Sequence, residues 1–328
     1  MKWNEEYRLL AEAPRAAANK GTGSSADINF VLMAALRDAG FTVTPILLNP
    51  RFAGRLPYTH ATINGINTFV LRITLDDGTY AYLDGTNPNT DVNLLPTQLL
   101  VDRARVYDMD GNDGWCDLSG ITSGAHSVNM NLAFDSDLSL SGPAFEQYTN
   151  QAALEASTRY RKAQSEEEYI EQMEKEQNAR LEEFKIEGVG SAHVKQSYRM
   201  TCTPESAGEF IYLNATVLPF MTTNRFKSPK RDLPVEFTMP ITYNIRGAVK
   251  IPEGYEVEET PKNINMIGCQ GDISCLYFSQ VAGEYLQFNL RFTLKRVIFL
   301  PKEYEDLKSF YGMVADLSNS KIVLRKKE

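Results

Sequence analysis

Apolar positions near the start of the chain predict one helix that is followed by antiparallel strands. Between residues 25 and 39 they recur at the i, i+3, i+4, i+7 spacing of a helix face. Other apolar residues surround that face, which predicts a helix buried nearly all round. Gly40 stands where a left-handed residue would end this helix. Trp3, Tyr7 and Leu10 share a helical spacing, which predicts a further helix within the first twenty residues.

Strands are predicted next, at 43–48, 67–75 and 79–84. The last two flank Asp77-Gly78, a strong hairpin signal. A two-residue turn there would put Leu71 opposite Asp84, so that Asn67 and Asp84 point to the same face of the sheet. A helix followed by antiparallel strands predicts an α+β core, which we assign to residues 1–110.

The rest of the chain alternates charged and strand-like segments. Residues 148–184 are polar and contain neither Gly nor Pro, which predicts one or two exposed helices broken near Gln164-Ser165. We assign residues 111–184, strands and charged helices, to the core domain as a connection. In 185–328, β-branched and aromatic segments predict a β-rich, sandwich-like C-terminal domain. One helix at 302–316 interrupts it.

Composition limits the classes of partner. The chain has 328 residues and 43% hydrophobic content, enough for two ordinary domain cores. Its 34 Lys and Arg against 42 Asp and Glu give a net charge of −8, which argues against nucleic acid or an anionic membrane surface as partner. No run of eighteen apolar residues occurs, so we expect no transmembrane helix. We expect no cofactor.

Two groups of residues could carry a cross-link or a metal. Cys269 and Cys275 flank a turn-like stretch and could form a disulfide in an oxidising compartment, or could both be free thiols. Asp108, Asp110 and Asn112 alternate as the ligands of a calcium loop do, but the loop lacks the expected Gly at its sixth position and Glu at its twelfth. An Asx-rich turn is the better explanation.

A motif near the start resembles the active-site frame of the transglutaminase-like, papain-related superfamily. The run from Gly23 to Asp27 is similar to the opening of that family's central helix, and the run from Leu83 to Thr86 is similar to its Asp-bearing strand. The resemblance places the family's catalytic Cys, His and Asp at Ser25, Asn67 and Asp84. It implies a cysteine-proteinase-like core.

Later segments resemble a subgroup common in Bacteroidetes, in which domains of unknown function flank such a core. The matching segments are 94–96, 224–227, 231–235, 251–255, 304–311 and 322–326. The resemblance thus covers nearly the whole chain. Such proteins usually carry a signal peptide and a further N-terminal domain, so we expect this chain to be a fragment of a longer exported protein, in the periplasm or at the cell surface.

The substitutions predict that catalysis is lost. A papain-type thiolate depends on a neighbouring imidazolium and on the helix dipole, and the Asp orients the His. A serine hydroxyl needs a base even more, and Asn67 cannot accept a proton. Ser24 and Ser25 are better explained as helix N-cap residues. His60, the nearest histidine in sequence, is better explained as an ordinary loop residue than as a substitute base.

We therefore expect a catalytically inactive module that binds a peptide or a glycan in the former cleft. Two alternatives stay open: a Ser-dependent amidase or acyltransferase with an altered mechanism, and a purely architectural module. Trp115, in a Gly/Asn/Asp-rich loop, is either an exposed binding aromatic or packed beneath its own loop. The candidate ligand-binding residues are Ser24, Ser25, Asn67, Asp84 and Trp115.

Overall fold

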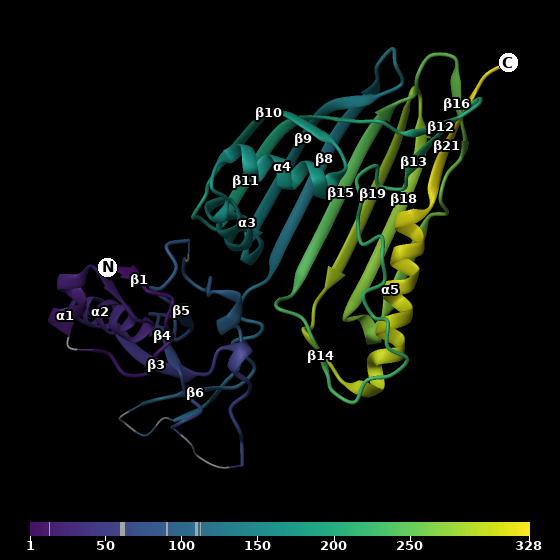
Figure 1. Cartoon of the computed structure of the whole chain (residues 1–328). Coiled ribbons are helices and arrows are strands. Elements are labelled where there is room, and N and C mark those ends of the chain that lie inside the picture. The colour runs from purple at the N-terminus through teal and green to yellow at the C-terminus, as the bar shows by residue number, and fades with distance from the viewer. Residues whose placement is uncertain (13, 60–62, 90, 109–110, 112) are drawn as a thin grey trace. The chain divides into compact units, whose positions relative to one another are not determined.

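The chain folds into two compact units of mixed α+β structure. A computed structural model gives the fold of residues 1–12, 14–59, 63–89, 91–108, 111 and 113–328 (Figure 1). One unit comprises Met1–Ser123 with Gly190–Ala192, and the other comprises Gly124–Val189 with His193–Glu328. Within these residues no helix combines the length and the apolar character needed to cross a bilayer.

The boundary between the units differs from the one that the sequence predicts. We assigned residues 111–184 to the N-terminal core, but everything from Gly124 to Val189 belongs to the second unit. The reason is strand pairing. Strand β8 (Gly124–Phe134) runs parallel to β15 (Ile241–Lys250) over ten residue pairs, and β9 (Leu140–Asn150) pairs with β11 (His193–Cys202).

The first unit is a five-stranded antiparallel sheet with a helix packed on it. The strand order is β5-β4-β3-β6-β7. Helix α2 (Ser25–Asp38) places Ala26 against Phe69, Leu71 and Ile73, which alternate along β4 and are buried. The strands are β3 (Thr42–Leu48), β4 (Thr68–Thr74), β5 (Tyr80–Leu83), β6 (Ala104–Val106) and β7 (Gly114–Cys116).

Helix α2 begins and ends where the sequence predicts, but it is not buried all round. Ser24 is its N-cap and forms a capping box with Asp27, and Gly40 follows it with a φ of 92°. Burial is confined to the first five residues, and Phe30 and Val31 are exposed. The described part of this unit supplies α2 with a sheet on one side only. A helix with apolar residues on all faces then leaves part of them in solvent.

The helix predicted within the first twenty residues is much shorter. Only α1 (Pro14–Lys20) forms, while β1 (Lys2–Trp3) pairs with β2 (Thr22–Gly23). The backbone of residues 4–12 forms hydrogen bonds with the start of α2. The carbonyl of Glu6 accepts from the N–H of Ser25, and the N–H of Glu12 donates to Asp27. Tertiary hydrogen bonds thus replace the helical ones that residues 4–12 would otherwise make.

The hairpin at Asp77-Gly78 forms, with a three-residue loop instead of the two-residue loop that the sequence predicts. The N–H of Leu75 donates to the carbonyl of Thr79 at 2.9 Å, so residues 76–78 make up the loop. Gly78 has a φ of 81°. This geometry is typical of a type I turn followed by a bulge. Every residue of β5 is therefore shifted by one position from its predicted partner.

The second unit contains an eight-stranded sheet in the order β10-β11-β9-β8-β15-β19-β18-β17 and a four-stranded sheet in the order β12-β13-β21-β16. Side chains of both sheets and of α5 (Tyr304–Asn319) meet in one buried cluster, which includes Leu213, Tyr277 and Leu324. A two-stranded ladder pairs β14 (Val235–Glu236) with β20 (Ile298–Phe299). The remaining strands are β10 (Arg180–Glu187), β12 (Glu205–Ala207), β13 (Phe210–Asn214), β16 (Tyr255–Glu259), β17 (Ile264–Gly268), β18 (Ile273–Ala282), β19 (Tyr285–Leu294) and β21 (Lys321–Lys326).

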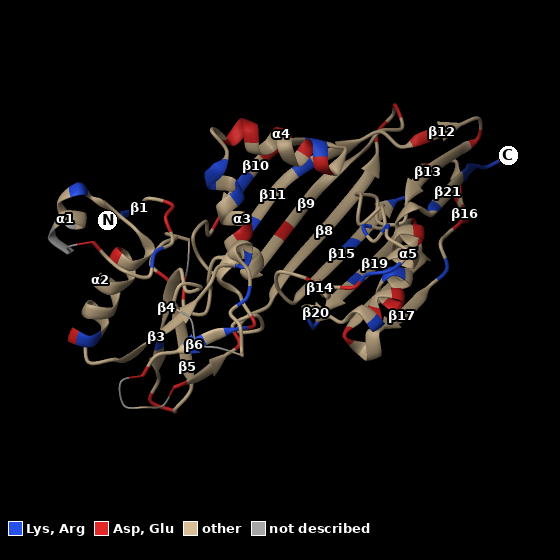
Figure 2. Cartoon of the chain, turned by 60° about the horizontal axis from the view of Figure 1, so that its bottom comes forward, with Lys and Arg blue, Asp and Glu red and all other residues tan. Residues whose placement is uncertain are grey.

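Two helices in this unit confirm the predicted break in the charged segment. Helix α3 (Gln151–Lys162) ends before Ser165, whose hydroxyl accepts from the N–H of Glu168 at the start of α4 (Glu166–Gln177). Acidic side chains gather at the N-terminal end of α4 (Figure 2). The positive end of the helix dipole stabilises their negative charge there.

Gly142 lets strands β8 and β9 approach closely. Its φ is 157°, and a β-carbon at this position would lie 2.1 Å from the carbonyl oxygen of Asn131. No residue with a side chain fits there without moving a strand. The two longest strands of the sheet are therefore in register only because position 142 has no β-carbon.

The structure distinguishes the two states that the sequence left open for Cys269 and Cys275. Cys269 and Cys275 are both free and buried, as in the alternative left open by the sequence. Cys275 pairs with Met266 across the β17–β18 ladder, whereas Cys269 lies in the connection Cys269–Gly271. Burial raises the pKa of each thiol to about 12, which makes both unreactive.

Candidate functional site

Ser25 and Thr68 of β4 meet at the start of α2. Ser25 is the first residue of α2 and is fully buried. The Thr68 hydroxyl donates to Ser25 Oγ at 2.8 Å. The side chain of Asn67 instead donates to Asn49 at 2.7 Å. The β4 contact to Ser25 thus comes from Thr68 instead of Asn67.

The one-residue shift of the hairpin also changes the predicted alignment of Asp84 with β4. Leu71 lies opposite Leu83, whereas we predicted that it lies opposite Asp84. Because side chains alternate along a strand, a shift of one residue exchanges the two faces. The predicted placement of Asn67 and Asp84 on one face of the sheet is therefore wrong.

Asp84 is buried and held by groups other than Asn67. The Asn29 amide donates to Asp84 at 2.9 Å and also to the carbonyl of Phe69 at 2.9 Å. The hydroxyl and the backbone N–H of Thr86 donate to the other carboxylate oxygen. Burial raises the pKa of Asp84, and the hydrogen bonds from Thr86 and Asn29 oppose that rise. Asn29 thus connects helix α2 to both strands of the hairpin, a role that we did not predict.

A segment of the chain covers the start of α2. The N–H of Arg8 donates to Ser25 Oγ at 2.9 Å, and the Ser25 hydroxyl lies 3.2 Å from the carbonyl of Arg8. Burial and the charge of Asp84 raise the pKa of Tyr7 in the same segment. Neither partner of Ser25 Oγ in the described part of the chain, Thr68 or the Arg8 backbone, can take up a proton.

Of the other candidates from the sequence, the structure describes Trp115 and Asp108. Trp115 is 43% exposed and packs edge-on against the ring of Tyr58, at 4.6 Å between centroids. Asp110, Asn112 and His60 lie outside the described residues, while the N–H of Asp108 donates to Asp113. Within the described ranges, no three His, Cys, Asp or Glu side chains group as metal ligands.

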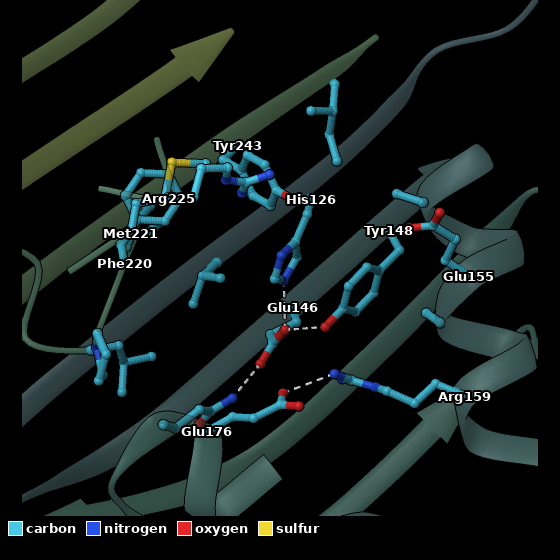
Figure 3. Close-up of a pocket in the computed structure, with 18 residues that line it drawn as sticks. His126, Glu146, Tyr148, Glu155, Arg159, Glu176, Phe220, Met221, Arg225 and Tyr243 are labelled. Carbon is cyan, nitrogen blue, oxygen red and sulfur yellow. Dashed lines mark hydrogen bonds and ion pairs between the residues drawn. The ribbon is translucent and has the colours of Figure 1, made fainter. Parts of the chain in front are cut away.

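A second candidate site is a pocket of about 480 Å³ inside the second unit (Figure 3). Its floor is one face of three adjacent strands, and helix α3 forms one wall. Residues of the loop after β13 form the opposite wall. The lining residues are His126, Val128, Glu146, Tyr148, Ala152, Glu155, Ala156, Arg159, Glu176, Gln177, Leu218, Pro219, Phe220, Met221, Arg225, Ile241, Tyr243 and Ile245.

Strand register explains the order of side chains on the floor. His126 of β8 lies opposite Tyr148 of β9 and opposite Tyr243 of β15. Its ring stacks on Tyr148 at 4.1 Å and meets Tyr243 edge-on at 5.9 Å between centroids. Helix α3 presents Ala152, Glu155, Ala156 and Arg159 at the i, i+3, i+4, i+7 spacing of one helix face.

Glu146 anchors the floor and is 3% exposed. His126 Nε2 donates to one of its oxygens at 2.6 Å, and the Tyr148 hydroxyl donates to the same oxygen. Tyr198 donates to the other oxygen at 2.5 Å and Gln177 at 2.8 Å. Burial pushes the pKa of Glu146 up, but His126, Tyr148 and Tyr198 outweigh it and hold the pKa at about 2. The carboxylate is thus ionised, and both of its oxygens are used within the protein.

Acid should therefore destabilise the second unit through Glu146. A carboxyl whose pKa is lowered on folding stabilises the fold above its ordinary pKa of 4.5, and this is lost as the pH falls toward about 2. The pKa difference corresponds to about 3 kcal/mol. Urea unfolding at stepped pH measures it, with Glu146→Gln as the control that removes this component. Equal pH dependence of the two proteins between pH 4.5 and 2 would contradict the assignment.

Two signals for this pocket are present in the sequence. His126, Glu146 and Tyr148 all lie on the inward face of alternating strands, where charged and polar residues are uncommon. We interpreted the charged face of residues 148–184 only as solvated, whereas α3 turns part of it toward the pocket. The pairing of β8 with β15 has no local signal, because 117 residues separate Ser127 and Asn244.

Comparison with known proteins gives a family match for part of the chain. Residues 209–324 match a family described as a domain of unknown function with a solved structure, DUF3858. The matched segment lies wholly in the second unit. No curated protein matches the chain.

The fold is similar to that of a candidate protease from Parabacteroides distasonis ATCC 8503. The TM-score is 0.55 at 13% sequence identity, over 96% of this chain and 46% of the other. This chain therefore spans less than half the length of that protein. At this identity the similarity concerns the fold alone.

Proposed function

We propose that this chain is a catalytically inactive module with a transglutaminase-like first unit and a sandwich-like second unit. It acts by binding, or as a structural part, in an exported protein of the bacterial cell envelope. The hydrogen bonding of Ser25 carries the proposal. Its Oγ bonds to Thr68 at 2.8 Å and to the backbone of Arg8 at 2.9 Å, and a serine with no base beside it is a poor nucleophile.

The burial of the frame supports the same conclusion. Ser25 is fully buried and Asp84 is 3% exposed, while residues 6–12 bond to the start of α2. A substrate carbonyl would have to displace this segment before it reached Ser25. The frame therefore favours a structural role for the first unit and leaves binding to another part of the chain.

Activity assays test the proposal directly. We expect neither amide hydrolysis nor incorporation of a fluorescent primary amine into casein above the buffer rate, with the same result for Ser25→Ala. Turnover that Ser25→Ala abolishes would overturn the proposal in favour of the serine-dependent amidase or acyltransferase.

A pair of double variants tests the geometry of the frame. Ser25→Cys with Thr68→His places a thiol and an imidazole at side chains that now touch, so any regained hydrolysis should occur there. Ser25→Cys with Asn67→His is the matched control and should stay inactive, because position 67 points toward Asn49. Activity in the control alone would contradict the assignment of position 68.

A further inference from the structure

The pocket of the second unit contains two opposite charges that no neighbour neutralises. Arg225 makes no ion pair with any described residue, and Glu155 makes neither an ion pair nor a hydrogen bond with one. The other charged groups are paired. Arg159 bonds to Glu176 at 2.8 Å, and Glu146 is saturated by four donors. One cation and one anion are thus available to a ligand.

These two charges lie on opposite sides of the pocket. Figure 3 shows Glu155 on the α3 side and Arg225 on the side of Phe220 and Met221, with His126 between them. The Arg225 guanidinium lies over the ring of Tyr311 at 5.4 Å from its centroid, a cation–π contact that orients it. A ligand that neutralises both side chains must carry a negative group at one end and a positive group at the other.

Apart from its charged groups, the pocket is largely aromatic and apolar. Tyr243, Phe220, Met221 and Ile245 line it, and the His126 ring is 22% exposed there. A volume of about 480 Å³ lies in the range of small-molecule sites. The ligand therefore has an apolar middle as well as charged ends.

We propose that this pocket binds a short peptide of two or three residues with both ends free. The terminal carboxylate pairs with Arg225, whose planar guanidinium suits a carboxylate. The terminal ammonium pairs with Glu155, and apolar side chains lie against Tyr243 and Phe220. A neutral sugar would leave both charges unmatched, and a simple anion would be repelled by Glu155.

The inference gives the proposed binding role a site and a ligand class. It uses the second unit alone, so its failure would leave the account of Ser25 in place, and serine-dependent turnover would leave the pocket in place. Binding and turnover are separate measurements.

Calorimetric titration of the whole chain with apolar di- and tripeptides tests the proposal. We expect binding of unmodified peptides and a loss of about tenfold to a hundredfold when either the amine is acetylated or the carboxylate is amidated. Arg225→Gln should abolish the preference for a free carboxylate, and Glu155→Gln should abolish the preference for a free amine.

Matched variants show whether the effect belongs to the pocket. Arg231→Gln removes an exposed arginine that also lies over an aromatic ring, Tyr304, outside the pocket. Glu171→Gln removes an exposed acid of α4. Both should bind peptides as the unchanged protein does. The proposal is wrong if no peptide of the panel binds below about 1 mM, if capped and free peptides bind equally, or if neutral oligosaccharides bind in their place.

Discussion

Replacing Glu146 by alanine should lower the free energy of unfolding of the second unit by about 3–5 kcal/mol. The change leaves four donors, from His126, Tyr148, Tyr198 and Gln177, without their acceptor in a buried site. Each unsatisfied buried donor costs about 1–3 kcal/mol before the structure relaxes. Urea unfolding followed by far-UV circular dichroism measures the loss.

Two further variants keep this prediction testable if the alanine variant does not fold. Glu146→Gln retains one acceptor oxygen and should lose less stability than alanine does. Glu171→Ala, at an exposed position of α4, should change the unfolding free energy by less than about 0.5 kcal/mol. Equal stability of Glu146→Ala and Glu171→Ala would contradict the central role of the carboxylate.

Replacing Gly142 by alanine should lower the free energy of unfolding by about 4 kcal/mol or more, a loss that is typical of a severe steric conflict. The added β-carbon would lie 2.1 Å from the carbonyl oxygen of Asn131, which belongs to a paired strand and cannot rotate away. Strands β8 and β9 would have to separate, and the floor of the pocket would separate with them. Thermal unfolding measures the cost.

Gly283→Ala is the matched control for this change. Gly283 has a φ of 63°, and a β-carbon there would meet nothing within 4 Å. The expected cost is about 1–2 kcal/mol, from left-handed backbone alone. If Gly142→Ala lowers the free energy of unfolding no more than Gly283→Ala does, β8 and β9 separate at little cost and the prediction is wrong.

Much of the first unit could be predicted because its signals are local. Ser24 caps α2, Gly40 ends it, and Asp77-Gly78 forms a turn, each within a few residues of the element that it shapes. The residues of the turn do not indicate whether the loop has two residues or three. That single residue decided which residue of β4 lies opposite each residue of β5.

The pocket could not be predicted because distant segments build it. His126 and Tyr243 are neighbours only through the parallel pairing of β8 with β15. Arg225 lies in an irregular segment after β13. Such a segment has no periodic pattern from which the direction of its side chain could be predicted. Parallel strands are joined by long connections, so the partner of a strand is distant in sequence. Hydrophobic alternation identifies each strand but does not indicate which strand pairs with it.

The bonds of Ser25 join three parts of the chain that are distant in sequence. Its backbone and side chain bond to residues 6–8 and to Thr68, and it opens α2. The small serine hydroxyl both donates and accepts at this fully buried position, which an apolar side chain cannot do. The presence of a serine at this position is therefore explained by the assembly of the fold, and a reaction is not required to account for it.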